Sequence, residues 1–162
     1  MYFRTLVRWG FPATAASWAA ALPLATFAAS RPQETLAHLS AAAVYVVGAA
    51  VCHQRPERSF SLLGAQMPVC ARCAGIYFGA ALAALAAEIG ASAKSAEKHK
   101  RRAGRATAIR MLSLALLPTA ATIGYEWTTG DMTSNVVRAA AGFCLGACVA
   151  ALIQREIQTE VN

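Results

Sequence analysis

The chain has 162 residues, of which 57% are apolar and only 14% charged, and its mean hydropathy is +0.42. Soluble domains carry about 25% charged residues, so this composition excludes an ordinary soluble domain, and the apolar content excludes disorder. The net charge of +7 would suit binding to nucleic acid. Membrane proteins, however, also concentrate basic residues in their cytoplasmic loops, so we expect no nucleic-acid partner. The sequence predicts one all-α domain, a polytopic bundle of membrane helices that contacts the lipid bilayer.

Five apolar stretches have about the length that crosses a bilayer, which is roughly 20 residues. They span residues 11–29, 36–52, 71–91, 108–127 and 135–153. None alternates with the period of two that a membrane β-barrel strand shows, so we expect helices.

The first stretch is the least certain span, because Pro12 and Pro23 interrupt it. Five spans would place Arg4 and Arg8 on the outer side, which the distribution of basic residues disfavours. If the first stretch lies along or dips into the inner face, four spans remain. A cleaved signal peptide is a third interpretation, and it would move the most basic segment to the outside.

The most basic segment joins the third and fourth stretches and covers residues 92–107. Its cations are Lys94, Lys98, Lys100, Arg101, Arg102 and Arg105. Basic loops stay on the cytoplasmic side, so we expect this segment to be cytoplasmic and residues 52–73 to lie on the outer side. The sequence thus predicts a multi-pass protein of the cell membrane, the inner or plasma membrane of its cell. A lipid-binding or partner-binding role for the segment is a weaker alternative.

Three of the five cysteines gather with one histidine between the second and third stretches, at Cys52, His53, Cys70 and Cys73. Zinc takes four nitrogen or sulfur ligands, and two cysteines separated by two residues can reach one ion. The pattern predicts a metal site, with zinc as the candidate ion. Cys52 and His53 are neighbours, however, and side chains one residue apart on a helix diverge by about 100°, so they share an ion only where the backbone bends.

The same thiols also suit redox chemistry. A helix is expected to begin near Cys70, and its positive end together with nearby arginines would lower a thiol pKa. Under this alternative Cys70 and Cys73 form the redox pair, Cys52 is a shuttle thiol, and the protein is a quinone-linked membrane thiol–disulfide oxidoreductase. Enzymes of the vitamin K epoxide reductase kind resemble it in architecture alone. A loop with incidental cysteines is the third interpretation, so the sequence leaves open whether the chain is an enzyme.

Residues 52–79 resemble a family of small bacterial and archaeal predicted membrane proteins classed as a domain of unknown function. The family shares a Cys-His-Gln-x-Pro-Glu-Arg-Ser-Phe stretch followed by Pro-x-Cys-x-Arg-Cys-x-Gly-x-Tyr-x-Gly. The matching residues are Cys52, His53, Gln54, Pro56, Glu57, Arg58, Ser59, Phe60, Pro68, Cys70, Arg72, Cys73, Gly75, Tyr77 and Gly79. The resemblance implies membership and a membrane location, and it implies no particular activity.

Three arginines of this region, Arg55, Arg58 and Arg72, form a separate candidate site. Guanidinium groups near a helix N-terminus suit an anion or a lipid headgroup. Interfacial anchoring and pairing with Glu57 is an equally good interpretation of the same residues.

The apolar stretches also carry packing signals. Gly75 and Gly79 have the Gly-x-x-x-Gly spacing that lets helices approach closely, and Gly142 and Gly146 repeat it. This spacing is compatible with an internal bundle, a homo-oligomer or a larger membrane complex.

The remaining polar groups of the stretches are few. Cys144 and Cys148 share one helix face, where we expect small packing residues rather than a site for a soft ion such as Cu(I). We expect Glu88 to pair with Arg110, and Glu126 with Arg138.

Overall fold

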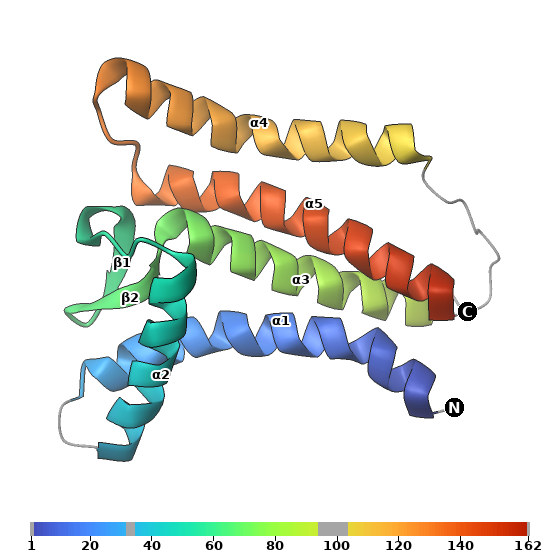
Figure 1. The fold of residues 1–162 in the computed structure, drawn as a ribbon, viewed down its shortest axis with the longest axis horizontal. Coiled ribbons are helices and arrows are strands. Elements are labelled where there is room, and N and C mark those ends of the chain that lie inside the picture. The colour runs from blue at the N-terminus through green and yellow to red at the C-terminus, as the bar shows by residue number, and fades with distance from the viewer. Residues whose placement is uncertain (1, 32–34, 94–103, 162) are drawn as a thin grey trace.

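The computed structural model describes residues 2–31, 35–93 and 104–161, which are mostly helical (Figure 1). The helices are α1 (Tyr2–Ala29), α2 (Thr35–Val51), α3 (Ala71–Ala93), α4 (Arg105–Thr129) and α5 (Asn135–Val161). Between α2 and α3 lie a single 3-10 turn, η1 (Pro56–Arg58), and an antiparallel hairpin of β1 (Ser59–Leu62) and β2 (Ala65–Cys70). The sequence predicted a loop between the second and third apolar stretches. The hairpin therefore differs from the predicted all-α fold.

Helices α4, α5, α3 and α1 lie side by side in that order, and α2 runs steeply across α1 at one end (Figure 1). The hairpin sits at that same end, which we call the hairpin end. Helix α1 begins and helix α5 ends at the opposite end, which we call the terminal end. Helix α3 packs against both α1 and α5, whereas α4 packs against α5.

Among the described residues, three helices are long and apolar enough to cross a membrane: Ala71–Gly90 in α3, Arg105–Thr129 in α4 and Asn135–Glu160 in α5. They correspond to the third, fourth and fifth predicted spans. Helix α2 is apolar but shorter, over Leu36–Val51. Helix α1 has 28 residues and contains both prolines of the first predicted stretch. Most of the basic segment 92–107 falls on residues 94–103, outside the described residues.

The two Gly-x-x-x-Gly pairs, Gly75 and Gly79 on α3 and Gly142 and Gly146 on α5, face each other. A Cβ atom added to any of the four would lie 2.0 to 2.3 Å from a backbone carbonyl oxygen of the other helix. No side chain larger than hydrogen fits at these positions without moving a helix. The spacing therefore serves packing between two helices of the same chain.

Ion pairs hold the helices at both ends. Glu126 accepts a hydrogen bond from Nε of Arg138 at 2.8 Å, as the sequence predicted. The predicted pairing of Glu88 with Arg110 is wrong, because the fully buried Glu88 lies 2.6 Å from Nη2 of Arg8. Helix α1 packs on α3 while α4 packs on α5, so Arg8 faces Glu88. Gln154 of α5 also donates to Glu88, at 2.9 Å.

A small apolar core fastens the hairpin to the helices. Leu22 of α1, Met67 and Val69 of β2 and Ala74 of α3 are buried together. Trp18 and Tyr77 pack against this core and meet edge to face, with ring centroids 5.8 Å apart. Because a two-stranded ribbon is marginal alone, this packing is what stabilises the hairpin.

Candidate metal centre

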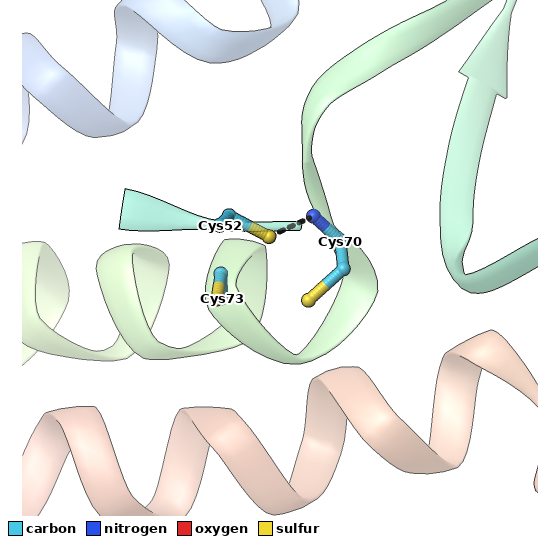
Figure 2. A group of neighbouring side chains, drawn as sticks. All are labelled: Cys52, Cys70 and Cys73. Atoms are coloured by element: carbon cyan, nitrogen blue, oxygen red, sulfur yellow. Dashed lines mark hydrogen bonds between the residues drawn. The ribbon is translucent and has the colours of Figure 1, made fainter. Parts of the chain in front are cut away.

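Three thiols from three different elements meet at the hairpin end (Figure 2). Cys52 directly follows α2, Cys70 is the last residue of β2, and Cys73 lies in the first turn of α3. The hairpin returns the chain to the end of α2, so that the backbone N–H of Cys70 donates to Sγ of Cys52 at 3.1 Å. The three Sγ atoms lie within 4.8 Å of one another.

The spacing of these thiols suits a shared ion. All three cysteines are free, Cys70 is buried, and the other two are half-buried. With Zn–S bonds of about 2.3 Å, tetrahedral geometry places two sulfurs about 3.8 Å apart. The observed upper limit of 4.8 Å thus exceeds a ligand-to-ligand edge by no more than about 1 Å, which side-chain rotation can close.

Electrostatics favour a thiolate in this group. The Cys73 thiol donates to the sulfur of Cys70 and lowers the pKa of Cys70 from 9.0 to about 5. The backbone N–H of Cys73 and the side chain of Cys52 act in the same direction, against the opposing effect of burial. Cys70 is therefore ionised at neutral pH, as both a metal ligand and a nucleophile must be.

His53 has a different environment from the thiols. Its side chain is exposed, and Nδ1 accepts a hydrogen bond from the backbone N–H of Arg55 at 3.2 Å. A neutral imidazole that accepts at Nδ1 carries its proton on Nε2, so neither nitrogen offers a lone pair to a metal in this arrangement. The structure thus brings together three of the four predicted ligands and leaves His53 outside the thiol group.

Gln54, which the sequence analysis did not single out as functional, fixes the end of α2. Its backbone has a positive φ of 47°, and its side chain donates to the carbonyl oxygens of Tyr45 at 2.9 Å and Pro68 at 2.7 Å. These bonds tie α2 to β2 directly beside Cys52. The glutamine in the Cys-His-Gln motif was the available signal for this role.

The three predicted anion-binding arginines occupy different surroundings. Arg55 is exposed, and Nε of Arg58 is buried without a partner. Arg72 points to α4, where Nη2 donates to the Thr122 hydroxyl at 3.0 Å and lies 3.9 Å from the Glu126 carboxylate.

The other two cysteines stay apart from the thiol group. Cys144 and Cys148 line two different apolar clefts, each of about 470 Å³. Among the described residues, the one group of three or more candidate metal ligands is Cys52, Cys70 and Cys73.

Comparisons with known proteins agree with the membrane assignment. A family model described as "Predicted membrane protein (DUF2085)" matches residues 52–152, from the first cysteine of the site into α5. An uncharacterised protein of Methanocaldococcus jannaschii is 56% identical over 36 residues, which are 22% of this chain and 23% of that protein. One of Methanothermobacter thermautotrophicus is 60% identical over 30 residues, 18% of this chain and 27% of that protein. The chain thus spans less than a third of each relative. No solved structure matches.

Proposed function

The chain belongs to the DUF2085 family of predicted membrane proteins. We propose that it holds one metal ion, zinc, at Cys52, Cys70 and Cys73. The observation that carries the proposal is the convergence of three sulfur atoms within 4.8 Å from the end of α2, the end of β2 and the start of α3. In this role the protein is a structural or binding component of the membrane, since a bound ion would join these three elements.

His53 is our candidate for the fourth ligand. It adjoins Cys52, and its ring needs to give up the hydrogen bond from the Arg55 amide to offer Nδ1 to the ion. Closed zinc sites have four protein ligands, whereas an open position admits water or a ligand from a partner. If His53 remains outside, the site presents an open position at the exposed face of the loop.

We propose four crossings rather than five. The Arg8–Glu88 pair places the N-terminal part of α1 at the terminal end, where α3 also ends and the basic segment follows. With α2 confined to the hairpin end, α3, α4 and α5 each cross once, and we count α1 as the fourth crossing because it packs along α3 although it is less apolar. Basic residues stay on the cytoplasmic side, so the terminal end is cytoplasmic and the metal site lies on the outer side of the cell membrane. A reporter fused to the N-terminus tests this: activity on the outer side would contradict it.

Metal analysis of the protein purified in a neutral detergent without chelator tests the site. We expect one zinc per chain in the wild type, and loss of that zinc in Cys70→Ser. Cys144→Ser is the matched control, because Cys144 lies outside the thiol group and should keep the ion. A wild type without metal whose three thiols all react freely would refute the proposal.

The second candidate function is thiol–disulfide oxidoreduction, and one observation favours it. An apolar cleft of about 470 Å³ is lined in part by Phe60, Met67, Ala74 and Phe78, and none of the three thiols lines it. Met67 and Ala74 belong to the same core that Cys73 packs against. Such a cleft suits the ring of a quinone. In this reaction the Cys70 thiolate and the Cys73 thiol form a disulfide, and their two electrons, the Cys73 proton and one proton from solvent reduce the quinone to quinol.

Mass measurement after thiol alkylation separates the two functions. The oxidoreductase predicts a Cys70–Cys73 disulfide that forms with added quinone and disappears with reductant. The metal site predicts three thiols that alkylate only after a chelator is added. The absence of any quinone-dependent disulfide would eliminate the second candidate.

A further inference from the structure

A second polar cluster lies at the hairpin end, between α3, α4 and α5. Arg138 of α5 is only 2% exposed, and it shares the carboxylate of Glu126 with Arg72 of α3. Oε1 of Glu126 is 2.8 Å from Nε of Arg138 and 3.9 Å from Nη2 of Arg72, and it also accepts a hydrogen bond from the Thr133 hydroxyl. One carboxylate oxygen thus faces both guanidinium groups.

The cluster carries one more positive charge than negative charge. Two guanidinium groups face a single carboxylate, and each keeps a buried nitrogen without a hydrogen-bond partner, Nη2 of Arg138 and Nε of Arg72. Buried donors are almost always satisfied, and an unmet guanidinium N–H in an apolar bundle is costly. Excess charge and unmet donors together indicate a missing anion.

The depth of the cluster indicates what the anion is. Glu126 lies three residues before α4 ends, and Arg138 lies three residues after α5 begins. Tyr125 and Trp127 flank Glu126, and the Trp127 side chain is 85% exposed. Exposed Trp and Tyr mark the level of the lipid headgroups in membrane proteins. Arg72 is 20% exposed, so a ligand can reach the cluster from that side.

We propose that Arg72 and Arg138 bind a phosphate group, because a guanidinium fork matches phosphate oxygens and the cluster lies at headgroup depth. The site uses none of the proposed metal ligands, although Arg72 lies between Cys70 and Cys73 in the chain. It differs from the arginine set that the sequence suggested, because Arg138 joins Arg72 while Arg55 is exposed elsewhere. Asn135 links the cluster to the hairpin: its Nδ2 donates to the Ser59 carbonyl at 3.0 Å, and its Oδ1 lies 3.5 Å from Nη1 of Arg138.

The test is a binding titration of the full chain in maltoside detergent, which contains no phosphate. Short-chain phosphatidylglycerol forms one arm and inorganic phosphate the other, and native mass spectrometry counts the bound molecules. We expect one bound molecule per chain, and a loss of affinity of about tenfold to a hundredfold in Arg72→Gln. Arg110→Gln is the matched control, since Arg110 is an exposed arginine on α4 toward the terminal end, and its affinity should not change.

The two arms identify the source of the phosphate. Binding of the lipid alone makes the ligand a headgroup, and binding of both makes it phosphate from either source. Arg72→Lys keeps the charge but not the planar fork, so a loss of about tenfold with a normal helical spectrum supports the proposal even if the glutamine variant unfolds. Failure of the wild type to bind either compound, or binding by both Arg72→Gln and Arg72→Lys as tight as that of the wild type, would overturn it.

Discussion

Replacing Gly146 by alanine should separate α3 from α5. The added Cβ would lie 2.0 Å from the carbonyl oxygen of Ile76, where ordinary contact begins at 3.4 Å, so the helices must open by about 1.4 Å. The obstructing atom belongs to helix backbone and cannot rotate away. Overpacking of this kind costs about 1–3 kcal/mol, and we take the upper value because backbone is struck. Alanine returns about 1 kcal/mol through its helix propensity. The net loss in the free energy of unfolding is then about 2 kcal/mol.

Gly90→Ala on α3 is the matched control for this experiment. A Cβ at Gly90 meets nothing within 4 Å, so the same chemical change should stabilise the protein by about 0.5–1 kcal/mol. Reversible unfolding of both variants in mixed micelles of maltoside and dodecyl sulfate, followed by circular dichroism, measures the difference. Equal stabilities for the two variants would refute the close approach of α3 and α5.

Two further predictions follow from the ion pair and the thiol group. Arg8→Leu should lower the free energy of unfolding by about 2–3 kcal/mol, because the buried carboxylate of Glu88 would lose its ion-pair partner. Arg110→Leu should change it by less than about 0.5 kcal/mol. Equal effects of the two variants in the same unfolding assay would argue against the Arg8 contact. In metal-free protein the alkylation rate of Cys70 should stay constant across neutral pH and fall only below about pH 5, since its pKa is lowered and the thiolate persists above that value. Cys73→Ala removes the donor thiol, so the midpoint should move up towards 9.0; an unchanged midpoint would exclude that cause.

The helices were the part of the fold best predicted from the sequence. The third, fourth and fifth apolar stretches lie within α3, α4 and α5, because in lipid a long apolar run has few structural alternatives to a helix. The arrangement of α1 could not be predicted in this way. Its position depends on which basic residue pairs with Glu88. The sequence offers several candidates, among them Arg8 and Arg110, and does not distinguish between them.

The hairpin and its effect on the site were harder to predict. Its strands have four and six residues, and Pro68 lies inside the second, where proline usually argues against a strand. Leu63 and Gly64 form the turn with positive φ, and leucine is an unusual residue there. The cysteine spacing predicted the three converging thiols. The ring of His53 instead accepts a hydrogen bond from the Arg55 amide, a local contact that no pattern of residue types reveals.

The reciprocal glycine contacts give α3 and α5 the character of a single rigid body. At both glycine pairs the backbone of each helix lies close to carbonyl oxygens of the other helix. Rotation or sliding of either helix would bring larger side chains against this backbone. Cys73 belongs to this body, whereas Cys52 and Cys70 belong to α2 and the hairpin. If the site binds an ion, as we propose, we expect α2 and the hairpin to take up the accompanying movement. The pair α3 and α5 is thus the fixed part of the molecule and carries Cys73. The end of α2 and the hairpin form the movable part and carry Cys52 and Cys70.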